Sequence, residues 1–174
     1  MAGKKAPRSS IQHFLNTGTT ETPEWNRLGF AVSSGEINYN TETEETADIT
    51  MDNKVTDITG YNRNFPIEGV VLPGDPVFEF VDDLRINMRV LDDLRTDLVN
   101  VWAYKTPTVT VTEDEPPVEV KTWPAERVPV NVGIDSIGGE GASSAKIKYT
   151  LYDAGPPVIG TFNPETKVFT AAGG

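Results

Sequence analysis

Alternation of apolar and polar residues with a period of two runs through most of this 174-residue chain. It is typical of strands, because successive side chains of a strand point to opposite faces of a sheet. The alternating segments are 35–40, 41–52, 55–72, 97–104, 106–122, 128–134, 146–152, 158–162 and 167–170. Turn-forming residues separate them, so we expect about eight to ten strands, mostly paired with their chain neighbours. Pro129 has no N–H to donate, which favours an edge or bulged strand for 128–134.

Residues 76–88 show the spacing of a helix instead. Asp75 can cap its N-terminus, and Pro76 suits the first helical position. Five apolar residues recur on one helical face. They are Val77, Phe80, Val81, Leu84 and Met88. We therefore predict a mainly β protein, an antiparallel β-sandwich or partly closed barrel, with this one helix flanking the sheet.

The first 26 residues resemble an arm ahead of a single β domain. That domain spans 27–174 and contains a variable loop or hairpin at about 106–122. The arm is rich in Gly, Ser, Thr and Pro and holds a few apolar anchors. The anchors are Ile11, Phe14, Leu15 and Trp25. Such a segment either docks against its own domain or a neighbour, or stays a mobile terminus.

Acidic residues outnumber basic ones by 26 to 15, for a formal net charge of -11. The excess is spread evenly: residues 1–62 hold 9 acids and 5 bases, 63–105 hold 8 and 5, and 106–174 hold 9 and 5. Proteins that grip nucleic acid or an anionic membrane by charge need a surplus of Lys and Arg, so this chain belongs to neither class. A polyanion can still lie beside DNA if its task is to avoid binding it.

The chain has no cysteine and one histidine, His13. These counts exclude disulfides, a thiolate nucleophile and Cys-ligated zinc, and they argue against His-cluster metal sites. No apolar run approaches the roughly 18 residues of a spanning helix, so we expect no membrane insertion. The basic N-terminus lacks the apolar stretch of a secretory signal. We expect synthesis in a cytoplasm.

Neighbouring carboxylates occur in the chain, for example Glu44 and Glu45, but they do not make a convincing site. In a strand they point to opposite faces, and no loop has the Asp spacing of a calcium site. His13 has no structured partner in sequence, and the Gly/Ser-rich stretches lack the Lys of a phosphate loop. We predict no catalytic residue, no metal and no cofactor. A carboxylate-dependent glycoside hydrolase is the weakest of three hypotheses, since any 26 acids contain possible pairs.

Three segments carry a resemblance to a known family. They are GDPVFEFVDDLR (74–85), VPVNVGIDSIGGE (128–140) and KIKYTLYDAGPPVIGTFN (146–163). Together with the arm and the acidic, Thr-rich hairpin before them, their order resembles the major tail tube protein of long-tailed, siphovirus-type bacteriophages of Gram-positive bacteria. The likeness covers roughly 7–170 and is one of segment order rather than of an invariant motif.

The resemblance implies a structural virion protein with a β-sandwich and a flanking helix. Its subunits would form stacked hexameric rings, whose strands join into a tube for DNA ejection, with synthesis in the host cytoplasm. The implied partners are further copies of itself, the tape measure protein, the tail terminator and distal tail or baseplate proteins, while genomic DNA passes without specific binding. The isolated anchors of the arm would then dock into another subunit.

An acidic lumen would let DNA slide without sticking, because carboxylates repel phosphates. The candidate lumen-facing acids are Glu42, Glu44 and Asp48, which share a strand face; the alternative is an outer face or a loop between rings. Lys146 and Lys148 place two positive charges on another strand face, which would need neighbouring acids if it lined the lumen. A different hypothesis is a monomeric carbohydrate-binding or capsid-decoration module. It would place Trp123, Tyr104 or Trp102 on an exposed face.

Overall fold

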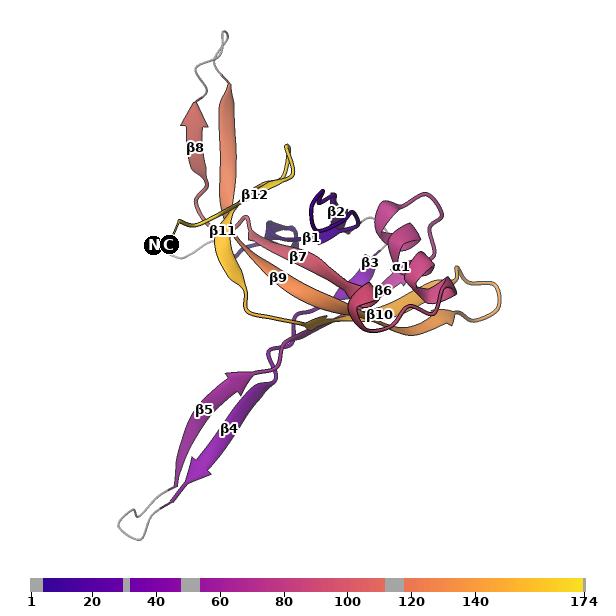
Figure 1. The fold of residues 1–174 in the computed structure, drawn as a ribbon, viewed down its shortest axis with the longest axis horizontal. Helices are drawn as coiled ribbons and strands as arrows, with labels where there is room; N and C mark the ends of the chain where they lie inside the picture. The colour runs from indigo at the N-terminus through magenta and orange to yellow at the C-terminus, as the bar shows by residue number, and fades with distance from the viewer. Residues whose placement is uncertain (1–4, 30–31, 48–53, 112–117, 174) are drawn as a thin grey trace.

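The computed structural model describes residues 5–29, 32–47, 54–111 and 118–173 (Figure 1). Its strands are β1 (Ile11–Asn16), β2 (Trp25–Leu28), β3 (Val32–Gly35), β4 (Thr41–Thr46), β5 (Val55–Tyr61), β6 (Asn64–Val70), β7 (Arg95–Trp102), β8 (Thr108–Val111), β9 (Glu119–Gly138), β10 (Lys146–Asp153), β11 (Val158–Asn163) and β12 (Val168–Ala171). The helix α1 (Pro76–Ile86) and two short 3₁₀ turns, η1 (Arg8–Ser10) and η2 (Leu91–Leu94), complete these elements.

Ten of these strands form one antiparallel sheet. Its main path runs β2-β1-β7-β9-β10-β6-β3, while β8 and β11 pair with β9, and β12 pairs with β11. Strands β4 and β5 pair with each other in a separate two-stranded sheet, which extends away from the main sheet (Figure 1). The predicted mainly β, antiparallel fold with one helix is confirmed.

Strand β9 connects the parts of the main sheet. It is 20 residues long and pairs with β8 and β11 near its start and with β7 and β10 further along. It is therefore central, and the expectation of an edge strand around Pro129 is wrong. A bulge is present close by, since the β9–β10 register shifts between Ile134 and Ser136. The Pro129 carbonyl accepts a hydrogen bond from the Ala154 N–H (2.8 Å), just past the end of β10. Because the N–H and C=O of a strand residue point the same way, the missing proline N–H faces this strand end and breaks no ladder.

The main sheet buries apolar side chains on both faces. The first core lies between the sheet and α1 and includes Leu15, Ile67, Val81, Leu98, Val130 and Leu151. The second core lies on the other side of β1, β7 and β9 and contains Phe14, Trp25, Val99, Val101, Ala125 and Phe162. Adjacent residues Phe14 and Leu15 enter different cores, as the alternation of a strand requires.

Helix α1 begins as the sequence predicts and ends two residues earlier. The Asp75 carboxylate accepts hydrogen bonds from the N–H groups of Val77 (3.0 Å) and Phe78 (2.9 Å). Val77, Val81 and Leu84 are buried as expected. The expected core position of Met88 is wrong, because the helix stops at Ile86 and the Met88 side chain is 83% exposed.

The N-terminal region is part of the sheet rather than an arm. Strand β1 lies between β2 and β7, with five residue pairs to β7 from Ile11 to Leu15. Phe14, Leu15 and Trp25 are each less than 5% exposed. This placement corrects the expected arm over 1–26. Long-range pairing with β7, some 85 residues away, could not be read from local composition.

Candidate functional site

Two of the three acids expected to face a lumen lie in the β4–β5 hairpin. Glu42 and Glu44 are in β4, where every residue is exposed. They are two residues apart in one strand and therefore share a face of the hairpin. Asp48, the third of these acids, lies outside the residues that the structure describes. The hairpin extends well away from the sheet (Figure 1). Glu42 lies near its root, where it lines a hollow with Tyr61 and Arg63 of the same chain.

Three of the four expected docking anchors are already in use inside the chain. Leu15 packs in the first core, and Phe14 and Trp25 pack in the second. Phe14 stacks against Phe162 with ring centroids 4.7 Å apart. Ile11 alone of the four keeps an outward surface, at 37% exposed.

Lys146 and Lys148 do have the neighbouring acid that sequence reasoning required. Both lie on β10 opposite β6, where Glu68 pairs with Lys148. The Lys146 Nζ lies 2.6 Å and the Lys148 Nζ 3.0 Å from the two carboxylate oxygens of Glu68. Hydrogen bonds from both ammonium groups hold the pKa of Glu68 below its usual value. The register of two strands far apart in sequence made this triad, so sequence reasoning could not single out Glu68.

A polar network crosses the sheet near the base of the hairpin. His13, Asn100 and Glu126 lie side by side on β1, β7 and β9. The His13 Nδ1 is 2.7 Å from the Asn100 Oδ1, and the Asn100 amide donates to the Glu126 Oε1 at 2.9 Å. Arg63 then bonds to Glu126 at 3.0 Å and to Asp153 at 2.7 Å. We call these five residues the polar network.

Burial controls the protonation of this network. His13 is 4% exposed, and desolvation lowers its pKa from 6.5 to about 4, against the smaller opposing effects of Asn100 and Glu126. His13 is therefore neutral at pH 7. Arg63 donates to two carboxylates, and these contacts outweigh its own desolvation and raise its pKa. Arg63 lies in the short connection between β5 and β6, so the network ties the root of the hairpin to β9 and β10.

The sequence carries one weak sign of this network. Glu126 lies in β9 between Ala125 and Arg127, and a carboxylate in a strand needs a partner if it is buried. The sequence does not indicate that Arg63 is its partner, because the two residues of this ion pair are 63 positions apart.

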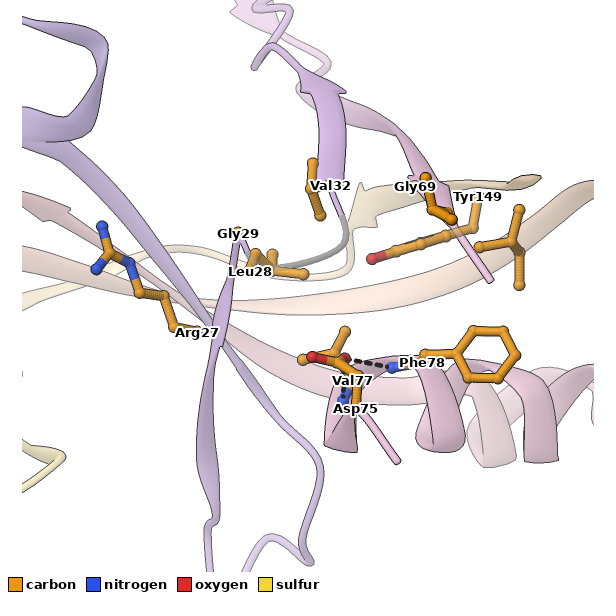
Figure 2. A pocket seen from close by; sticks show the side chains of 11 residues that line it. Arg27, Leu28, Gly29, Val32, Gly69, Asp75, Val77, Phe78 and Tyr149 are labelled. Carbon is orange, nitrogen blue, oxygen red and sulfur yellow. Dashed lines mark hydrogen bonds between the residues drawn. The ribbon is translucent and has the colours of Figure 1, made fainter. Parts of the chain in front are cut away.

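A small gap under α1 has too little volume for a ligand. It measures about 20 Å³ and is lined by residues of α1, β2, β3, β6 and β10. Figure 2 shows the Tyr149 hydroxyl directed toward Leu28 and Val32, and Asp75 bonded to the first turn of the helix. Burial raises the pKa of Tyr149 well above its usual value, so this phenol is neutral. The volume is about that of one water molecule.

The open hollows of the surface are larger. One of about 480 Å³ is lined by aromatic and aliphatic side chains from β1, from the end of β7 and from the segments that follow β3 and β7, with Arg8 and Glu36 beside them. These side chains are Ile11, Ile37, Tyr39, Trp102 and Tyr104, and we call this hollow the aromatic groove. A wider hollow of about 960 Å³ shares Tyr39 with it and runs along the root of the hairpin past Tyr61, Pro156 and Pro157.

The structure brings no reactive constellation together in the part of the chain that it describes. No group of three or more His, Asp or Glu side chains there could hold a metal ion. No helix among the described residues is long and apolar enough to cross a membrane. Trp123, a candidate stacking residue, is partly buried against the second core.

Comparison with known proteins gives likeness at the level of fold. No family model matches the sequence, and no curated protein does. A chain in the tail of an empty GTA particle with C6 symmetry superposes with a TM-score of 0.54 at 13% identity, over 96% of this chain and 100% of that one. A chain of an extracellular contractile injection system, the PVC sheath/tube terminator in the extended state, gives 0.51 at 14% identity, over 91% and 99%. This chain therefore has a tail tube-like fold.

Proposed function

We propose that this protein is a tail tube subunit of a siphovirus-type bacteriophage of Gram-positive bacteria. Copies assemble as hexameric rings that stack into a tube, located in the tail of the virion after synthesis in the host cytoplasm. The observation that carries the proposal is the fold likeness to a chain in a tail of C6 symmetry, which spans nearly the whole length of both chains. Its partners are the tape measure protein, the tail terminator and the distal tail or baseplate proteins.

Two surfaces are available for the lumen of such a tube. The first is the exposed face of β4 with Glu42 and Glu44, and we propose that these two acids, together with Asp48, face the DNA path. The second is the uncovered face of β6 and β10, where Glu68 sits between two lysines. The ion pairs with Glu68 partly neutralise Lys146 and Lys148, which lowers the affinity of these lysines for phosphate. Both surfaces fit a channel through which DNA slides without specific binding.

Electron microscopy of the purified chain tests the proposal. We expect hollow tubes of six-fold symmetry once the protein is concentrated, and a reconstruction of these tubes identifies the lumen-facing residues directly. The control is the same chain in the presence of denaturant below the unfolding midpoint, where weak contacts between subunits are lost first. A protein that stays monomeric at every concentration, and is absent from tubes in virions, contradicts the proposal.

One observation favours the second candidate, a carbohydrate-binding or capsid-decoration module. Tyr39, Trp102 and Tyr104 line one open groove, and aromatic rings of this kind stack on sugars. The prediction for this candidate is a monodisperse monomer that binds glycans and loses binding in Trp102→Ala. Glycan-array measurements on the monomer decide it, and tube formation without glycan binding rules it out.

A further inference from the structure

The loop after α1 exposes apolar side chains in a backbone conformation that disfavours them. We call residues 86–91, from the last residue of α1 to the first residue of η2, the post-helix loop. Its four exposed apolar residues are Ile86 (62%), Met88 (83%), Val90 (64%) and Leu91 (84%). Met88 and Leu91 also have positive φ angles, 48° and 55°. Side chains other than Gly, Asn and Asp rarely adopt this left-handed region, because Cβ crowds the backbone.

The hydrogen bonds around Met88 define a helix end that normally takes glycine. The Met88 N–H bonds to the Arg85 carbonyl (3.2 Å), and the Arg89 N–H bonds to the Leu84 carbonyl (3.1 Å). This is the Schellman pattern, in which the left-handed residue is usually Gly. A large apolar side chain at that place weakens the monomer through strain and through exposure to water. A contact outside the monomer is the role that remains for it.

The aromatic groove has the complementary character. Ile11, Tyr39 and Tyr104 present exposed apolar surface there, at 37%, 52% and 51%. Arg8 lines the groove, and the Lys105 ammonium lies 4.7 Å from the centre of the Trp102 ring. Around the post-helix loop the sequence places four carboxylates and three guanidinium groups: Asp82, Asp83, Asp92 and Asp93 with Arg85, Arg89 and Arg95. Arg85 pairs with Asp82, and Arg89 pairs with Asp83 and Asp93. The surroundings of the loop therefore carry a small excess of negative charge, whereas Arg8 and Lys105 outnumber Glu36 at the groove, so the two surfaces differ in the sign of their net charge.

The post-helix loop cannot reach the aromatic groove of its own chain. Strand β7 begins at Arg95, directly after η2 and the post-helix loop, and ends at Trp102 in the groove. Eight strand residues span about 23 Å, so the loop and the groove lie at opposite ends of one rigid element. Figure 1 shows the same separation between the α1 end and the β8 end of the sheet. A contact between two different surfaces of identical chains repeats from copy to copy and builds rings or filaments.

We infer that the post-helix loop of one copy docks its Met88 and Leu91 side chains into the aromatic groove of a neighbouring copy. This inference rests on the proposed self-assembly and assigns one of its contacts. It also gives the strained left-handed residues a role, since the apolar surface that costs stability in the monomer is buried in the assembly.

Crosslinking tests the contact, and the absence of native cysteine makes it specific. Tubes of the double variant Met88→Cys, Tyr104→Cys should form disulfide-linked ladders on mild oxidation, while each single variant should not. The matched control pairs Met88→Cys with Ile159→Cys, an exposed position on β11 outside the groove. Tubes that form without a ladder, with the thiol at position 104 still open to maleimide, overturn the inference and leave the proposed function intact. A wild-type chain that forms no tubes overturns both.

A second variant separates assembly from folding. Met88→Gly removes the apolar side chain and relieves the left-handed strain. The unfolding midpoint of the monomer should therefore rise, while the concentration needed for tube growth should rise at least tenfold. Ile159→Ala, which trims another exposed apolar side chain, should leave that concentration unchanged. A Met88→Gly chain that assembles as readily as the wild type contradicts the docking role.

Discussion

The polar network is the part of the core where single residues matter most. His13 and Glu126 are 4% and 6% exposed, and both have partners in the network. In the described part of the chain, no buried side-chain nitrogen or oxygen lacks a hydrogen bond. A fully satisfied polar network inside a sheet specifies register, because each partner must be opposite its neighbour. The network also makes the stability of the fold depend on pH and on charge.

Stability should fall with acid through His13. Its pKa is about 4 in the folded chain and near 6.5 when unfolded, so below pH 6.5 the unfolded chain binds the extra proton. Neutral His13 therefore leaves the free energy of unfolding at its full value above pH 6.5. As the pH falls from 6.5 toward 4, protonation of the unfolded chain lowers the free energy of unfolding by about 3 kcal/mol. The measurement is urea unfolding of the monomer at pH 7 and pH 4. His13→Gln should lose less stability over this range, by that amount.

The comparison with His13→Gln isolates this one group. Glu68, whose pKa is lowered, and Asp97, whose pKa is raised by burial, titrate equally in both proteins. Arg8 and Glu126, the charged groups facing His13, are also common to both. Equal acid sensitivity of the two proteins would show that His13 is not responsible.

The Arg63–Glu126 pair should be costly to break from either side. Both side chains are mostly buried, at 12% and 8% exposed. Arg63→Met leaves the Glu126 carboxylate buried without its cation, so we expect a loss of about 3 kcal/mol in the free energy of unfolding. Adding Glu126→Leu to this variant removes the unpaired buried carboxylate and should restore part of the lost free energy of unfolding. A double-mutant cycle in urea measures this coupling, and additive losses would contradict it.

At the scale of elements, the Asp75 cap is the local signal that positions α1. Its carboxylate satisfies two of the helix N–H groups that have no partner within the helix. Asp75→Ala should therefore cost about 1 kcal/mol of unfolding free energy, whereas Asp75→Asn keeps an acceptor oxygen and should cost much less. Thermal or urea unfolding of both variants checks the ranking. Equal losses would assign the effect to charge rather than to capping.

The β4–β5 hairpin is an element that adds surface without adding core. All residues of β4 are exposed, and β5 has one partly buried residue, Gly60. Its root is held by Arg63 and by the pair of backbone hydrogen bonds between Asn38 and Asn64. A two-stranded hairpin has little stability of its own, so we expect its role to lie in contacts outside the monomer.

At the scale of the whole molecule, removal of this hairpin should leave the chain folded but unable to assemble. Replacing 41–61 with a two-residue Asn-Gly turn keeps Arg63 and the main sheet. The unfolding free energy should change by no more than about 0.5 kcal/mol, since little buried side-chain surface is lost. Tube formation should fail. Circular dichroism measures whether the truncated chain folds, and electron microscopy shows whether it forms tubes. A truncated chain that is unfolded, or one that still forms tubes, contradicts the prediction.

The sequence alone determined the local features of this protein. Period-two alternation predicted the antiparallel β fold, and Asp75 with Pro76 predicted where the helix begins, because both signals arise from neighbours along the chain. Tertiary structure decided which strands meet. It placed Phe14, Leu15 and Trp25 in the cores, put Pro129 in a central strand and brought Glu68 to the lysines of β10. These contacts join residues far apart in sequence, and a periodic pattern states which way a side chain points but not which strand lies beside it.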